Sequence, residues 1–363
     1  MPPLLPTAPC IRALRSHTAP TIPPHYQFQS ALRLRALSTT APIPHTPICP
    51  SPTCTCSPTP PNLDIDRKTP LLHTMASYSQ HLLVCTGKDN WSSRIEDETT
   101  PSGDFVRGVK GVIGKGGEGF DPFNNVMLTA SSFPSPESEG RGATTTTALL
   151  FPAFKRILAI PHTSASYSAL ATAYLKATLL HPAHANLSPA QKAHLTRDPS
   201  LASELPPAAP ITTPTVLICG HGGRDQRCGI LGPILRAGFQ AEFTRRGIDG
   251  SVGLISHIGG HKYAGNVIIY IPPGWRGITA RSGSLTQGTE SGLSGTGIWY
   301  GRVGPENVEG VVEETLVKGR IITELFRGGI TREGRMLGRM LEEQIKREGG
   351  EEGGLKLKPR ARR

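Results

Sequence analysis

The sequence has no C-x-x-C pair, no Walker A motif and no apolar run as long as a membrane helix. Without C-x-x-C the chain has no thioredoxin-type dithiol site, and without Walker A it lacks the usual phosphate-binding loop of an NTPase. A membrane helix needs roughly eighteen or more successive apolar residues, so no transmembrane segment is expected. Most of the net charge of +11 lies in residues 1–63 and 331–363, and the weakly charged middle does not indicate a nucleic-acid-binding protein.

The first 63 residues contain no aspartate or glutamate, while they carry four arginines. A basic, acid-free and Ser/Thr-rich start is typical of a mitochondrial transit peptide, and residues 35–38 (RALS) resemble a matrix-protease cleavage site. The Pro/Thr-rich residues 40–75 are expected to be disordered. We therefore expect a mitochondrial protein, in the matrix or the intermembrane space; an untargeted extension is the alternative. A start at Met75 would give a shorter form.

Two cysteines and two histidines lie in the glycine-rich segments ICGHGGRDQRCG and SHIGGHKYAG. Thiolate and imidazole together favour zinc or iron–sulfur chemistry over magnesium or calcium. Eight residues separate the cysteines, more than the about two to four of a zinc knuckle. The wide spacing favours a [2Fe–2S] cluster, in which each iron takes two protein ligands and histidine can replace cysteine. A structural zinc ion and no metal at all are the alternatives. The candidate ligands are Cys219, Cys228, His257 and His261.

Apolar, β-branched runs place these residues at the ends of strands. Cys219 would close the first strand, and His257 and His261 would flank a tight loop after the second. His221 is expected beside the ligands or in solvent. Arg224 and Arg227 could stabilise a reduced cluster, dock an acidic partner, or be merely solvated. The expected strands are 213–220, 252–257, 266–274 and 297–303, with helices over 230–248 and over 305–329, the latter ending at Gly328-Gly329.

The N-terminal half of the chain echoes these segments. HLLVCTGKD (81–89) resembles TVLICGHGGRD, and NNVMLTASSFP (124–134) resembles NVIIYIPPG. The echoes suggest a degenerate second copy without ligands, in which Cys85 is a buried strand-end thiol and Trp91 is a core residue. Residues 110–120 contain a formal G-x-G-x-x-G, but no acidic residue completes a dinucleotide site, so a flexible loop is expected.

The segments ICGHGGRDQRCG, SHIGGHKYAGNVIIYIP, IWYGRVGPENV and ELFRGG resemble the fungal sucrase/ferredoxin-like family, in particular its mitochondrial branch. The resemblance covers roughly residues 76–330 and implies an α/β fold with a C-terminal thioredoxin-like ferredoxin domain. It also implies a bis-histidinyl [2Fe–2S] centre, with Cys219 and Cys228 on one iron and His257 and His261 on the other. A role in mitochondrial redox homeostasis is implied as well. No residue pattern supports a sucrase activity.

We therefore expect an electron-transfer or redox-sensing protein rather than an enzyme that turns over a substrate. Its partners would be redox proteins of unknown identity and the iron–sulfur assembly machinery. The alternatives are a thiol-dependent oxidoreductase that uses Cys85 or an exposed residue at the edge of the cluster, and a zinc-stabilised interaction module. The expected segments are a transit peptide and disordered region (1–75), an α/β domain that is a degenerate thioredoxin-like copy (76–185), a linker with a short helix (186–210), the ferredoxin domain (211–330) and a helical, basic tail (331–363).

Overall fold

The computed structural model describes residues 41–53, 58–135, 144–281 and 284–349. The expected transit peptide before residue 41 and the basic end after residue 349 lie outside the described residues, as do Cys10, Cys54 and Cys56. No helix in the described ranges is long and apolar enough to cross a membrane.

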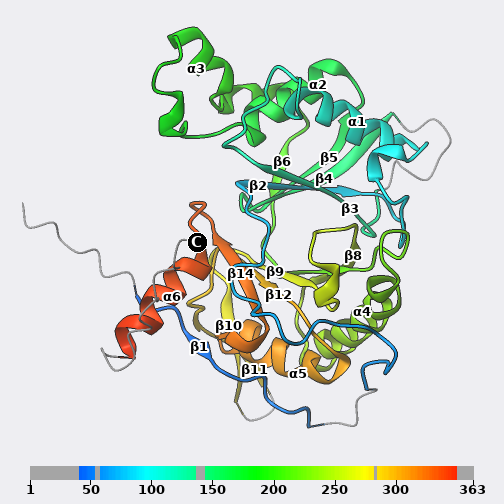
Figure 1. Ribbon diagram of the computed structural model, residues 1–363, viewed down its shortest axis with the longest axis vertical. Helices are drawn as coiled ribbons and strands as arrows, with labels where there is room; N and C mark the ends of the chain where they lie inside the picture. Colours follow the sequence, from blue (N-terminus) through cyan, green and yellow to red (C-terminus); the bar gives the residue numbers. More distant parts are fainter. Residues whose placement is uncertain (1–40, 54–57, 136–143, 282–283, 350–363) are drawn as a thin grey trace, which may run out of the picture. The chain divides into compact units, whose positions relative to one another are not determined.

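Strands from both halves of the described chain form one mixed sheet (Figure 1). Its order is β14-β12-β9-β7-β8-β3-β2-β4-β5-β6, and helices pack on it, so the α/β prediction is confirmed. The strands are β2 Gln80–Cys85, β3 Val126–Ser131, β4 Thr145–Phe151, β5 Lys155–Pro161, β6 Ala208–Pro210, β7 Thr215–Cys219, β8 Ser251–Ile255, β9 Val267–Ile271, β12 Thr296–Tyr300 and β14 Phe326–Thr331. The helices are α1 Pro101–Ile113, α2 Ser164–Leu170, α3 Pro189–Leu195, α4 Gln226–Arg246, α5 Val308–Val311 and α6 Leu337–Glu348.

The two halves of the sheet have the same connections. In the C-terminal half, β7 is parallel to β8 across α4 and antiparallel to β9, with β12 and then β14 beyond. In the N-terminal half, β2 is parallel to β3 across α1 and antiparallel to β4, with β5 and then β6 beyond. The halves meet where Ser131 of β3 pairs with Ile255 of β8. The short sequence echoes thus occupy matching places, and β2 and β7 each end in a cysteine.

Strand β7 has both faces buried, which explains its unbroken apolar sequence. Successive side chains of a strand point to opposite faces. Val216 and Ile218 therefore join the core that also contains residues of α4, while Leu217 and Cys219 join a second core on the other face. Cys219 is directed into this second core because it lies two residues after Leu217.

The strands that we predicted around the ligands and the helix after Cys228 are confirmed, but the helix predicted over 305–329 is wrong in its second half. The continuous helical backbone ends at Val317, because Gly319 has φ +66°, a left-handed conformation that interrupts a right-handed helix; a single 3-10 turn follows at Thr323–Leu325. The following β-branched and aromatic residues then form the short strand β13 (Ile321–Ile322) and β14. The spacing of the apolar residues in this segment is compatible with a helix or with a strand, and pairing with β12 selects the strand.

Residues 41–53 and 58–75 differ from the expected disorder, because they pack along the C-terminal half. Ile43 donates to Gln344 of α6 (2.6 Å) and accepts from it (3.1 Å), and β1 (His45–Thr46) pairs with β13. Ile43, Cys49, Leu71 and Met75 are buried. Prolines favour extended backbone, so a few apolar anchors suffice to hold this segment against the domain.

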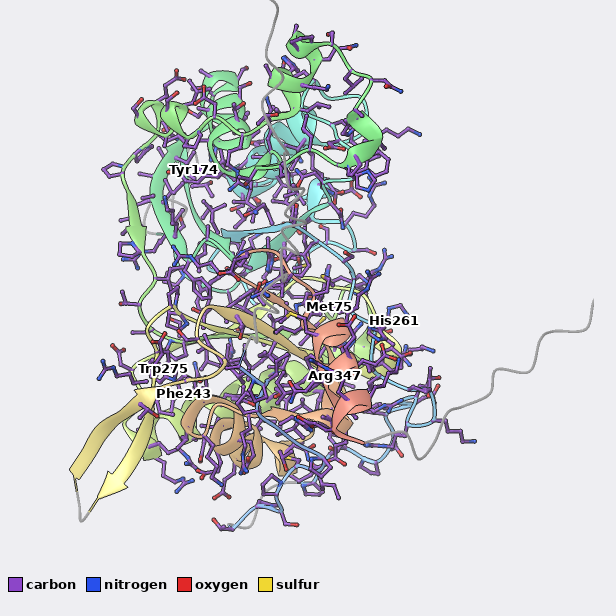
Figure 2. The ribbon with its side chains drawn as sticks, turned by 90° about the vertical axis from the view of Figure 1, so that its left-hand side faces the viewer. Met75, Tyr174, Phe243, His261, Trp275 and Arg347 are labelled. Atoms are coloured by element: carbon purple, nitrogen blue, oxygen red, sulfur yellow. The ribbon has the colours of Figure 1, made fainter. Side chains whose placement is uncertain are left out.

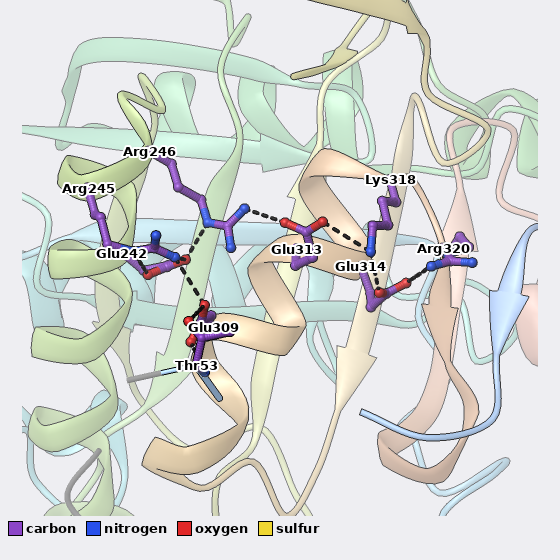
Figure 3. A network of polar contacts seen from close by, with 9 residues as sticks. All are labelled: Thr53, Glu242, Arg245, Arg246, Glu309, Glu313, Glu314, Lys318 and Arg320. Atoms are coloured by element: carbon purple, nitrogen blue, oxygen red, sulfur yellow. Dashed lines mark hydrogen bonds and ion pairs between the residues drawn. The ribbon is translucent and has the colours of Figure 1, made fainter. Parts of the chain in front are cut away.

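An ion-pair network holds the end of α4 against the helical residues after β12 (Figure 3). Arg246 bridges carboxylates from both elements. Glu309 joins the N-terminal segment to the network by accepting the backbone N–H of Thr53 (2.8 Å) and its hydroxyl (2.7 Å). The network contains Glu242, Arg245, Arg246, Glu309, Glu313, Glu314, Lys318 and Arg320.

A buried polar network connects the two halves of the sheet. His81 lies with Nδ1 2.9 Å from the Tyr270 hydroxyl and Nε2 2.7 Å from Thr129 Oγ1. The Tyr270 hydroxyl is 2.8 Å from that of Tyr78, which accepts a hydrogen bond from the indole of Trp299 (3.1 Å). Burial lowers the pKa of His81 to about 3, so the ring is neutral at physiological pH.

This network predicts a loss of stability in mild acid. In the unfolded chain His81 binds a proton below a pKa of about 6.5, whereas in the native state it does so only near pH 3. The free energy of unfolding therefore falls as pH falls between these two values. Between pH 7 and pH 5 the loss from His81 is about 2 kcal/mol. His81→Gln keeps hydrogen-bonding capacity without titrating, so its free energy of unfolding in urea should fall by about 2 kcal/mol less than that of the wild type. An equal fall in both proteins would contradict this origin.

Candidate metal centre

The two cysteines lie at the junction of β7 and α4. Cys219 is the last residue of β7, and Cys228 lies in the first turn of α4, which Asp225 caps by accepting the N–H of Arg227 (3.0 Å). Both thiols are buried, at 2 % and 1 % exposure. The thiol of Cys219 contacts that of Cys228 and the ring of His257. The hydrogen bond between the two thiols lowers the pKa of Cys219 and raises that of Cys228, and burial raises the pKa of Cys228 further.

Close backbone contacts shape the cysteine loop. A Cβ on Gly229 would lie 2.6 Å from Gly222 Cα, and one on Gly232 would lie 2.6 Å from Gly220 Cα and 3.0 Å from the Cys219 carbonyl oxygen. The first turns of α4 can therefore approach the end of β7 only because these positions lack side chains. This approach brings Cys228 to Cys219.

Replacing Gly232 with alanine should separate α4 from β7. We expect a loss of about 1–3 kcal/mol in the free energy of unfolding, measured in urea on the cluster-free protein, because the methyl group overlaps backbone that cannot move freely. Gly111→Ala is the matched control: it lies in α1, and no neighbouring atom lies within 4 Å of its added Cβ. The control should be stabilised by about 0.5–1 kcal/mol through helix propensity. An unchanged free energy of unfolding in Gly232→Ala would mean that α4 can move away from β7 with little loss of stability.

The two histidines lie on the loop that follows β8. His257 comes two residues after β8, and His261 begins a short 3-10 helix, His261–Tyr263. Gly259 and Gly260 between them have φ of +83° and +70°, a conformation that folds the loop back and brings the rings together. The ring centroids are 5.4 Å apart. His257 is half-buried beside the cysteines, whereas His261 is exposed at the surface (Figure 2).

His221 is buried beside the candidate ligands and is not solvated. Its Nδ1 accepts the backbone N–H of His257 (2.9 Å), and its Nε2 lies 2.9 Å from the carbonyl oxygen of Ser92 and 3.1 Å from that of Trp91. Both ring nitrogens are thus engaged, with Nε2 as the donor. His221 therefore positions His257 and joins the site to the Trp91 loop of the N-terminal half.

The arginines of the cysteine loop have different surroundings. Arg227 binds Asp225 through two nitrogens (2.9 and 2.8 Å) and donates to the carbonyl of Asp64 (2.7 Å), so it fixes the loop. Arg224 is exposed and donates to the Ser93 hydroxyl (3.3 Å).

Arg327, which lies in β14 within ELFRGG, is a further residue of the site that was not predicted from the sequence. Its guanidinium is 1 % exposed and lies against the histidine loop. Nη1 donates to the Gly259 carbonyl (3.2 Å) and to Asn266 Oδ1 (2.6 Å), and the side chain covers the rings of Tyr263 and Trp299. The signal in the sequence was an arginine between Phe326 and two glycines, but its hydrogen-bond partners are distant in sequence.

The four candidate ligands come together as two pairs. Within the described ranges, no three or more His, Cys, Asp or Glu side chains are placed to hold a single metal ion. Cys219 contacts Cys228, and His257 lies beside His261. Two pairs of soft and borderline donors suit a cluster of two metal atoms, in which each metal takes two protein ligands. They suit a single ion with four protein ligands less well.

Cys85 occupies the place in the N-terminal half that Cys219 occupies in the other. Burial raises its pKa to about 12, so the reactive thiolate is suppressed. The interpretation as a buried strand-end thiol is confirmed, and Trp91 is a core residue as predicted.

The sequence profile of a family described as Sucrase/ferredoxin-like matches residues 71–328. Several curated relatives carry the name "Altered inheritance of mitochondria protein 32". The relative from Clavispora lusitaniae is 45% identical over 122 residues, which are 33% of this chain and 36% of the relative. That from Debaryomyces hansenii is 46% identical over 115 residues, 32% and 35% of the two chains. One from Saccharomyces cerevisiae is 40% identical over 115 residues, 32% of each.

The matched segment thus spans about a third of the length of these curated relatives. No solved structure shows a significant match to the chain.

Proposed function

The chain belongs to the sucrase/ferredoxin-like family, and from this premise we propose that it is a mitochondrial [2Fe–2S] protein that transfers single electrons or senses redox state. The observation that carries the proposal is the convergence of two buried, touching thiols with a pair of adjacent imidazoles. Cys219 and Cys228 would hold one iron, and His257 and His261 the other. Two sulfur and two nitrogen donors match the ligand requirement of such a centre.

We infer further that each half of the sheet is a thioredoxin-like unit. The order β8-β7-β9-β12, with a helix between the parallel strands β7 and β8, supports this for the C-terminal half. The order β3-β2-β4-β5 supports it for the N-terminal half. In the described part of the chain, the four donors all belong to the C-terminal copy, with Cys219 and Cys228 at the junction of β7 and α4 and the two histidines on the loop after β8.

The mitochondrial location is supported by the name of the relatives, which refers to inheritance of mitochondria, and by the basic, acid-free start of the sequence. The matrix and the intermembrane space are both compatible with these observations.

When bound, the cluster would supply a site that accepts and returns one electron. The chain's own residues determine how that site meets its surroundings. The buried thiols exclude water from one side, and His221 holds the backbone of His257 in place. The exposed ring of His261 provides the edge at which a redox partner can approach (Figure 2).

Metal and sulfide analysis of the full chain, matured in cells and purified without oxygen, tests the proposal. We expect about two iron and two acid-labile sulfide per chain, a brown-red colour, and an EPR signal after dithionite reduction. Stoichiometric zinc in a colourless protein would establish the zinc-stabilised alternative instead. A protein with neither iron nor sulfide would end the proposal.

A further inference from the structure

The guanidinium of Arg327 is a buried cation whose hydrogen-bond acceptors are all neutral. Its Nη1 donates hydrogen bonds to Gly259 and Asn266. Its Nη2 donates to the Thr74 carbonyl (2.6 Å), and its Nε donates to the Thr74 hydroxyl (3.1 Å). Two aromatic rings, those of Tyr263 and Trp299, cover its faces at 5.5 and 5.7 Å. Among the described residues, no carboxylate forms an ion pair with it.

Such an arrangement is unusual, because a charged side chain is almost never fully buried unless it is paired. Burial lowers the pKa of Arg327 to about 10, so the side chain remains a cation at neutral pH. Besides the hydroxyl of Tyr263, the groups whose negative charge would stabilise it are the thiols of Cys219 and Cys228. Because the guanidinium donates to the carbonyl of Gly259, between His257 and His261, the missing negative charge is expected at the centre that these histidines and the cysteine pair would hold.

Arg327 also fits closely against the loop that carries the histidines. A Cβ on Gly260 would lie 2.4 Å from its Nη2. Asn266, which accepts from Nη1, donates in turn to the Gly260 carbonyl (3.0 Å). These contacts fix the position of the charge relative to the loop that carries the two histidines.

We propose that Arg327 is the built-in counter-charge of the metal centre and that it raises the midpoint potential by stabilising the reduced state. This inference rests on the proposed function. An oxidised [2Fe–2S] core with two thiolates and two neutral imidazoles has no net charge. One added electron makes it a monoanion, with no bond made or broken, and a fixed cation nearby favours that change.

The test is the midpoint potential of the cluster-loaded full chain at fixed pH, with iron counted in every sample. Arg327→Gln removes the charge, and Asn266→Asp gives the guanidinium its own carboxylate; both should shift the potential to more negative values. Arg327→Lys keeps the charge and should remain closer to the wild type.

Arg302→Gln is the matched control. Arg302 lies over the same Tyr263 ring at 5.4 Å, but it has a carboxylate partner in Asp66 at 3.7 Å. Its removal should shift the potential less than that of Arg327. A wild-type potential in a loaded Arg327→Gln or Asn266→Asp protein would overturn the inference, as would an equal shift in Arg302→Gln.

Arg327→Gln and Asn266→Asp could both lose iron that the wild type retains. In that case the melting temperatures of the cluster-free proteins test the inference. Asn266→Asp should then melt above the wild type, because it supplies the missing anion; equal or lower melting would overturn the inference. Absence of iron from the wild type itself would refute the proposed function, and the same melting comparison would still report whether the charge lacks a partner.

Discussion

Cys219→Ala is expected to lose the iron and the visible absorption of the protein, whereas Cys85→Ala should keep both. The two thiols are matched in the fold: each ends the first strand of its half, and each is 2 % exposed. Their surroundings differ, because Cys219 contacts Cys228 and His257, while burial alone dominates the pKa shift of Cys85. The pair of variants therefore separates loss of a ligand from loss of a buried sulfur atom.

The measurement is iron per chain after maturation in cells, with the visible spectrum and the melting temperature of each variant. Cys219→Ala should also melt at a lower temperature than Cys85→Ala, since a cofactor bound only by the folded state stabilises it. Retention of full iron in Cys219→Ala would remove this residue from the ligand set. Equal loss of iron in both variants would indicate a general folding defect.

Replacing His257 and His261 together with cysteine should retain a cluster and lower its midpoint potential by on the order of a few hundred millivolts. Two thiolates in place of two neutral imidazoles make the centre more negative, so the added electron is opposed more strongly.

The wild-type potential should also depend on pH, because a ligated imidazole can bind a proton at its second nitrogen. Reduction favours that proton, so the potential should fall as pH rises; in the double variant this dependence should be lost.

Potentiometry across pH, followed by EPR, provides both results. His194→Cys, on the exposed surface of α3, controls for the addition of a reactive thiol and should leave the potential unchanged. A wild-type potential that does not vary with pH would argue against histidine ligation. A double variant with the wild-type potential would exclude these two side chains as ligands.

Local patterns in the sequence predicted the elements that frame the site. The apolar runs at 213–220 and 266–274 are buried strands, and the helix predicted over 230–248 forms, although it begins earlier, at Gln226. The family resemblance is also confirmed. These predictions succeeded because burial of a strand on both faces demands a continuous apolar sequence, whatever its partners are.

Predictions failed where long-range pairing competes with local preference. The sequence predicts a helix over residues 305–329, but β12 pairs with the backbone of residues 326–331, so these residues form β14. The segment before Met75 looked disordered, but the C-terminal half supplies the surface on which it packs. Neither partner is visible from the local sequence.

Side-chain chemistry and short spacing in the sequence were sufficient to predict the candidate donors, two cysteines and two histidines in glycine-rich loops. Three contacts required the folded chain: the two cysteine thiols meet, His221 holds His257, and Arg327 is buried beside the histidine loop without a carboxylate partner among the described residues. These contacts join residues up to 253 positions apart, as between Thr74 and Arg327. Such contacts arise from the register of the sheet and from close backbone packing, which no local pattern encodes.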